Sequence, residues 1–291
     1  MKAAQTVGRI VLTAVAYVVG MASAGILSPA LHLPAMRAIP GTSAQQVFLL
    51  MVLSLPILIV GLLPLASGFK GTGLQRWFAI AALLYVTLGL NTLIEAKIFT
   101  GLLDGSPFVA SLFWILPAAL TAFALTYRFG ETRPSPSAVG DFGAAGWSWR
   151  LCLAWLVWPF IYFLFGMCVG PFVVPYYTTG GPLGLRIPGF DVIIGTQLLR
   201  SAIFLAASFP AILLWTKSRG RLFVALGLAY AVTVGLFQLA QASFFPMMMR
   251  VAHSLEITAD SFAYAAVLTL LFTRKSKAAQ PQLNTTSAAA D

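Results

Sequence analysis

The chain has 291 residues, of which 59% are hydrophobic and 9% are charged, and its mean hydropathy is +0.89. A soluble domain carries about 25% charged residues, so this composition excludes an ordinary soluble globule. The net charge of +10 would suit nucleic acid, but the basic residues stand at the ends of apolar runs, where anionic lipid and membrane topology explain them. We therefore expect the lipid bilayer as partner and no nucleic acid; the sequence predicts no oligomeric state.

A helix of about 20 apolar residues crosses the hydrocarbon layer, and eight stretches of the chain approach or exceed that length. In chain order they cover residues 10–27, 47–66, 77–93, 108–127, 151–169, 192–215, 222–244 and 247–272. The sequence therefore predicts an all-α fold, a polytopic membrane bundle of eight transmembrane helices.

The first stretch also resembles a secretory signal peptide. Lys2 and Arg9 precede its apolar run, and Ala22-Ser23-Ala24 resembles a cleavage site. Cleavage would leave seven spans, whereas the internal repeat described below favours retention of the first helix.

Positive charge is unevenly distributed between the loops. With the N-terminus in the cytoplasm, thirteen lysine and arginine residues fall on the cytoplasmic side and four on the outer side, while Arg200 lies inside a span. Because cytoplasmic loops accumulate Lys and Arg, we expect a multi-pass protein of the cell (inner) membrane with both termini in the cytoplasm.

The two halves of the chain match at an offset of 146 residues. Several positions of the third span match the seventh, among them Thr87 with Thr233 and Gly89 with Gly235, and Arg128 matches Arg274. Each half holds four helices, so the halves share one orientation and their symmetry axis follows the membrane normal, as in parallel-repeat transporters. We thus predict two parallel four-helix repeats.

The repeat divides the chain into four parts. Residues 1–128 form the first repeat, 129–148 a cytoplasmic linker that contains Arg133-Pro134-Ser135-Pro136, and 149–274 the second repeat. Residues 275–291 are polar and small, which predicts a disordered cytoplasmic tail.

Polar residues gather in the predicted outer half of the spans. They are Asn91 and Glu95 in the third span, Arg200 in the sixth, Gln241 in the seventh, and Arg250, His253, Glu256 and Asp260 in the eighth. A charge inside a bilayer costs about 3 kcal/mol or more and therefore faces a cavity or a partner. We expect a cavity that opens to the outside, is lined by spans three, six, seven and eight, and binds a small molecule or an ion.

The four polar residues of the eighth span share one face of the helix. Glu256 is expected at the same depth as Arg200, which predicts a Glu256–Arg200 ion pair with Asp260 nearer the midplane. In the alternative interpretation these residues only hold the helices together.

Two further segments carry weaker signals. Residues 171–190 are expected to form an interfacial loop at the mouth of the cavity, with Tyr176 and Tyr177 in the headgroup layer. Cys152 and Cys168 fall in one apolar run and are expected to be small buried residues, without disulfide or metal-ligand spacing.

His253 and Glu256 have a spacing compatible with metal ligation, with His32 or Glu95 completing the site, and the two histidines could also ligate a haem. Neither pattern is specific, and the sequence contains no HExxH, GxSxG, phosphate loop or CxxC. We therefore predict no metal, no cofactor and no assigned catalytic residue; a general-base role for His253 stays open as an alternative.

Three functions fit these features. The first is a transporter of a small solute or ion, in which Asp260 or Glu256 binds a proton or cation and Arg200 an anionic group. The second is a membrane-embedded enzyme that acts on a lipid-linked or outer-surface substrate, with or without a metal. The third is a non-catalytic assembly or immunity-type component. We expect the transporter.

Overall fold

The computed structural model describes residues 2–39, 41–127, 138–179 and 183–273, and within these ranges the chain folds into helices and three isolated β-bridges. Five spans are single helices: α1 (Lys2–Ala30), α2 (Ala44–Ala66), α7 (Ala144–Thr178), α8 (Phe190–Leu213) and α11 (Met247–Phe272). The other three are composite: α3 (Gly73–Leu84), η1 (Tyr85–Leu90) and α4 (Asn91–Phe99); α5 (Pro107–Ala110), η2 (Ser111–Trp114) and α6 (Ile115–Thr126); α9 (Arg219–Ala231), η3 (Val232–Leu236) and α10 (Phe237–Gln241).

Among the described residues, eight spans are long and apolar enough to cross a membrane. The predicted all-α bundle of eight apolar helices is therefore confirmed in helix number and order. Local signals explain where several helices begin. Thr72 and Gln75 form a reciprocal capping box before α3, the Ser43 side chain accepts a hydrogen bond from the Gln46 N–H before α2, and Pro107 occupies the first turn of α5.

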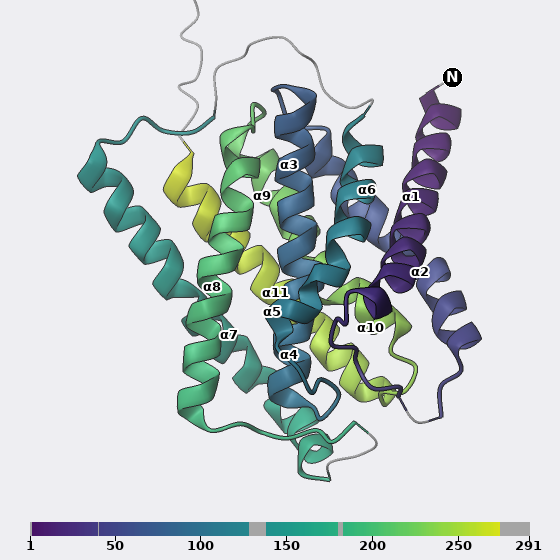
Figure 1. Cartoon of the computed structure of the whole chain (residues 1–291). Helices are drawn as coiled ribbons and strands as arrows, with labels where there is room; N and C mark the ends of the chain where they lie inside the picture. The colour runs from purple at the N-terminus through teal and green to yellow at the C-terminus, as the bar shows by residue number, and fades with distance from the viewer. Residues whose placement is uncertain (1, 40, 128–137, 180–182, 274–291) are drawn as a thin grey trace, which may run out of the picture.

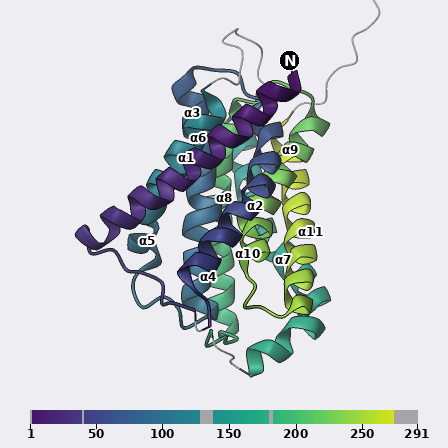
Figure 2. The ribbon, with the colours of Figure 1, turned by 90° about the vertical axis from the view of Figure 1, so that its right-hand side faces the viewer.

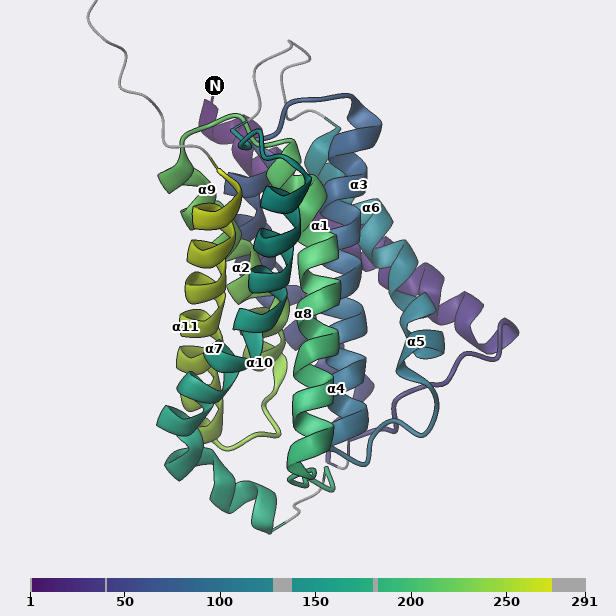
Figure 3. The same cartoon turned by 90° about the vertical axis from the view of Figure 1, so that its left-hand side faces the viewer.

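The prediction of a loop over residues 171–190 was wrong for its first part. Helix α7 continues through Pro171 and Pro175 to Thr178, so Tyr176 and Tyr177 are helical. Proline kinks a helix without ending it where the freed carbonyls find other partners. In Figure 3 the lower part of α7 bends away from the direction of its upper part.

Each span packs against more than one neighbour. Helix α1 lies along α6, α7 lies along α11, α2 packs against α9, and α3 packs against α8, while α11 and α6 also lie against α9 and α3, respectively. Figure 2 shows α1 crossing the bundle obliquely. The third and seventh spans are the most buried of the eight, and their π-helical segments η1 and η3 contact each other. These two spans form the centre of the bundle.

The described loops gather at two opposite ends. At the end where α1 begins and α11 finishes (Figure 1), bridges join Phe69 to Trp215 and Val139 to Thr273. At the other end, Met36 pairs with Leu103, and the Leu183 carbonyl accepts a hydrogen bond from the Gly101 N–H. An even number of spans returns the chain to its starting side, which agrees with this grouping.

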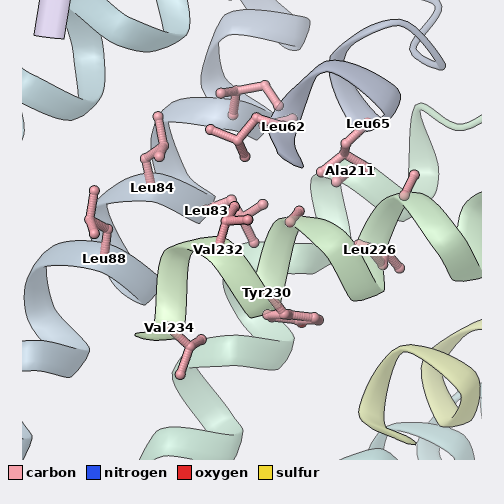
Figure 4. Packing of buried hydrophobic residues seen from close by; sticks show 14 of the residues in the cluster. Leu62, Leu65, Leu83, Leu84, Leu88, Ala211, Leu226, Tyr230, Val232 and Val234 are labelled. Carbon is pink, nitrogen blue, oxygen red and sulfur yellow. The ribbon is translucent and has the colours of Figure 1, made fainter. Parts of the chain in front are cut away.

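An apolar core lies toward the end of the bundle where α1 begins. It includes Leu62 of α2, Leu83 of α3, and Leu226 and Tyr230 of α9, all at most 2% exposed, and Figure 4 shows these side chains packed together. Next to them the Thr87 hydroxyl of η1 lies 2.8 Å from the Thr233 hydroxyl of η3.

The structure also bears on the predictions for the two cysteines and for the linker between the repeats. Cys152 and Cys168 are exposed on α7, so the prediction that they are buried was wrong. One face of α7 has no neighbouring helix among the described residues, and an apolar run does not indicate which face of a helix packs against the bundle. Helix α7 begins inside the predicted linker 129–148. Linker residues 129–137 and the predicted tail 275–291 lie outside the described residues.

Candidate functional site

A cavity of about 280 Å³ lies at the end of the bundle opposite the start of α1, beneath loop residues such as Met36, Leu102 and Leu183. Four spans contribute its polar and aromatic lining: Thr92, Glu95 and Phe99 from α4, Tyr162 and Tyr177 from α7, Gln238 from α10, and His253, Glu256 and Asp260 from α11. These side chains come from distant parts of the sequence, and the cavity is the place where the bundle collects them.

Arg200 of α8 lies behind the wall of this cavity and is 3% exposed. Its Nη2 lies 2.7 Å from Oε1 of Glu95, its Nε donates to Oδ1 of Asn91 at 2.7 Å, and its Nη1 donates to Oε1 of Gln197 at 3.0 Å. The same Gln197 oxygen accepts from Trp158 Nε1 at 3.1 Å. The guanidinium is thus engaged at all three nitrogens.

The predicted Glu256–Arg200 ion pair was wrong, because Arg200 pairs with Glu95. Helix α8 packs against α3 and η1. Arg200 of α8 therefore points toward α4, the helix that continues the span of α3 and η1. Asn91 and Glu95 stand four residues apart on one face of α4 and receive it together. Two residues at the same depth in the membrane form a pair only if their helices are neighbours, and depth alone does not show which helices are neighbours.

The polar stripe of α11 faces the cavity in part. His253 Nδ1 lies 2.8 Å from Glu256 Oε2, and both residues line the cavity. Asp260 also lines it, is 5% exposed, and has an Oδ1 atom without a hydrogen-bond partner among the described residues. An unpaired buried acceptor costs about 1–3 kcal/mol, so Asp260 is the group in the wall with most to gain from a ligand.

Besides Arg200, three predicted residues do not line the cavity. Asn91 instead accepts a hydrogen bond from Arg200 behind the cavity wall. The Gln241 amide donates to the Phe237 carbonyl of its own helix at 2.8 Å. Arg250 Nη2 lies 3.7 Å from Met247 Sδ. The last two therefore make contacts within their own helices and not with the cavity.

The expected lining by spans three, six, seven and eight needs one correction. Span five, through Tyr162 and Tyr177, takes the place of span six. An aromatic residue within an apolar run gives no sequence signal of its orientation, and Tyr177 fell in the segment interpreted as a loop. Gln197 and Trp158, which hold Arg200, were missed for the same reason: each looks like an ordinary helix residue until its neighbour is known.

The metal interpretation finds no support in the described structure. No group of three or more His, Cys, Asp or Glu side chains within these ranges is arranged to hold a metal ion. His32, one of the two proposed additional ligands, is exposed in the turn after α1, where its φ of 50° ends the helix. Three carboxyl groups and one imidazole thus line the aromatic-walled cavity, and the Arg200 guanidinium lies behind its wall.

No protein-family model, characterised protein or solved structure matches the chain. The function is therefore argued from the site.

Proposed function

We propose that the chain is a multi-pass membrane transporter for a small cation, with its binding cavity open toward the outer side of the membrane. The observation that carries this proposal is the buried Oδ1 of Asp260, which has no hydrogen-bond partner among the described residues and belongs to a residue that lines the cavity and is 5% exposed. Glu95 already neutralises Arg200, so Glu256 and Asp260 leave the cavity with an excess of acidic groups. A proton or small organic cation satisfies them, whereas an anion meets a guanidinium that is already engaged.

The proposed architecture is two parallel four-helix repeats related by a twofold axis along the membrane normal. Contacts between residues 146 positions apart support it: Thr87 with Thr233, Thr92 with Gln238, and Phe69 with Trp215. A residue touches its own symmetry equivalent only close to a twofold axis. The helix pairs α1–α6 and α7–α11, and likewise α2–α9 and α3–α8, are also equivalent under this offset.

Transport requires a change of conformation, and we propose that the two central spans carry it. Both interrupt their α-helical hydrogen bonding at the same level, at η1 and η3, beside the Thr87–Thr233 contact. π-Helical turns are often found at functional sites because they leave the backbone locally adaptable. The buried apolar side chains beyond these segments, such as Leu62, Leu83 and Leu226, would close the path toward the cytoplasm, as alternating access requires of a state open on one side.

Flux measurements on the purified protein test this function. Liposomes containing the protein are expected to accumulate radiolabelled tetramethylammonium faster than protein-free liposomes, and Asp260→Asn is expected to reduce this flux at least tenfold. Asp191→Asn is the matched control, because Asp191 is exposed in the first turn of α8. Flux that survives Asp260→Asn, or no flux of either tetramethylammonium or protons in the wild type, would contradict the proposal.

A second function, a membrane-embedded enzyme, is favoured by the 2.8 Å contact between His253 Nδ1 and Glu256 Oε2. A carboxylate that holds one imidazole nitrogen directs the other toward a substrate as a general base. Under this proposal the protein converts a lipid-linked or outer-surface substrate at the same cavity. A new product found by mass spectrometry after incubation with lipid extract, and lost in His253→Gln, would favour it over transport.

A further inference from the structure

A second, apolar hollow of about 400 Å³ lies between α7 and α11. Phe165, Cys168 and Phe172 form one wall, and Met248, Leu255 and Ala259 form the other. Phe172, Met248 and Leu255 are more than half exposed, so this groove faces outward from the bundle. In a membrane it would lie against acyl chains.

The groove meets the cavity at Glu256, which lines both. On the α7 side of this junction stands Gly166, where an added Cβ would lie 3.4 Å from Glu256 Oε1. The other carboxylate oxygen is held by His253. The glycine therefore leaves Glu256 Oε1 accessible between the helices, where an apolar surface changes to an acidic one.

The groove between α1 and α6 provides the contrast. It is also open and apolar, but its lining consists of aliphatic and aromatic residues and contains no charged side chain. A carboxylate at the inner edge is thus a property of the α7–α11 groove and not of lipid-facing grooves in general on this bundle.

The cavity side of the junction suits an ammonium group. Glu256 and Asp260 supply carboxyl oxygens, and the rings of Tyr162 and Tyr177 line the same space. Aromatic faces attract ammonium groups, especially those with little water around them. Phe99 packs edge-to-face on Tyr177 with ring centroids 6.4 Å apart, which holds that ring in place.

We propose that the site takes a cationic amphiphile: an ammonium head group lies between Glu256 and Asp260, and a single alkyl chain leaves the cavity beside Glu256 and lies in the α7–α11 groove. This inference rests on the cavity of the proposed function and narrows its substrate to a class. The alkyl chain contacts the apolar side chains of the groove on one side and lipid acyl chains on the other. The acidic groups at the junction select a positively charged head group.

Binding to the full-length protein in nanodiscs, corrected for empty nanodiscs, tests it. Radiolabelled dodecyltrimethylammonium is expected to bind at least tenfold more tightly than tetramethylammonium, and dodecylphosphocholine and dodecyl sulfate are expected to compete weakly. Ala259→Trp fills the groove and is expected to bring the two ammonium affinities within threefold while tetramethylammonium still binds. Cys168→Trp fills the groove from the other wall and serves if the first variant fails to fold.

The matched control is Ala16→Trp, the same change in the α1–α6 groove, which is expected to keep the wild-type ratio. Asp260→Asn is expected to weaken both ammonium ligands at least tenfold. A chain-length advantage that survives both groove variants, or equal binding of dodecyl sulfate, would overturn the inference. If binding depends on the alkyl chain but tetramethylammonium is not transported, the amphiphile site is supported and the transport proposal is refuted. If tetramethylammonium is transported but binding does not depend on the alkyl chain, transport is supported and the amphiphile site is refuted.

Discussion

Arg200 and Glu95 form an ion pair of 2.7 Å across the interface between α8 and α4, with the arginine 3% and the glutamate side chain 36% exposed. The rings of Trp158, Tyr162 and Phe204 lie within 5.8 Å of the guanidinium carbon. The positive charge is thereby enclosed on one side by aromatic rings and on the other by acceptors. It ties α8 to the central span that carries the cavity wall.

We expect Arg200→Met to destabilise the fold. Removing one partner of a buried pair costs about 3–5 kcal/mol, and the lower end applies because Glu95 is partly exposed. Adding Glu95→Gln to Arg200→Met is expected to recover part of the loss, because the orphaned carboxylate is then absent. Equilibrium unfolding in mixed micelles measures Arg200→Met, Glu95→Gln and the double variant, and additive losses would show that the two side chains are not coupled.

The threonine contact at the centre of the bundle is expected to contribute little. Interhelical hydrogen bonds in membranes average about 0.6 kcal/mol, and each hydroxyl also lies within hydrogen-bonding distance of its own helix, at the carbonyls of Leu83 and Ala229. Thr87→Val and Thr233→Val should each cost about that much. Because they remove the same contact, the double variant should lose less than the sum of the two.

The same contact permits a geometric test. With Cys152 and Cys168 replaced by serine, Thr87→Cys combined with Thr233→Cys is expected to form a disulfide under mild oxidation, since the two hydroxyl oxygens are 2.8 Å apart. Thr87→Cys combined with Ser111→Cys is the control, because the Ser111 hydroxyl bonds to Tyr85 and not to Thr87. Mobility on non-reducing gels reports the crosslink, and equal crosslinking of both pairs would contradict the central arrangement.

Gly89 of η1 is expected to be intolerant of a side chain. An added Cβ would lie 2.5 Å from Trp114 Cβ, an atom close to the backbone that cannot swing away. Gly89→Ala should therefore cost about 1–3 kcal/mol through overpacking. Gly25→Ala in α1 meets nothing within 4 Å and should be neutral or slightly stabilising, because alanine favours helix. Thermal unfolding compares the two, and equal midpoints would refute the packing.

Labelling tests the proposed orientation of the bundle. In a variant without Cys152 and Cys168, Asp104→Cys should react with a membrane-impermeant maleimide added to intact cells, because Asp104 is exposed at the cavity end. Ser67→Cys lies exposed at the opposite end and should react only after permeabilisation. The reverse pattern would place the cavity on the cytoplasmic side.

Much of the fold follows from local sequence. Apolar runs long enough to cross a bilayer predict eight helices because backbone polar groups in hydrocarbon must pair within their own helix. The capping residues Ser43 and Thr72 mark helix starts for equally local reasons. Prolines gave a poor signal in α7, since a long helix packed against α11 accommodates Pro171 and Pro175 with a bend.

By itself, the sequence determined that apolar helices alternate with short loops and that ionisable residues concentrate toward one end of the spans, because burial in lipid acts on each segment separately. Only the tertiary structure decided that Arg200 meets Glu95, that Tyr162 and Tyr177 line one cavity with the carboxyl groups of α11, and that Oδ1 of Asp260 has no hydrogen-bond partner among the described residues. Those relations depend on which helices are neighbours and how each is rotated. Helix rotation is set by side-chain packing between spans, and an apolar run leaves it open.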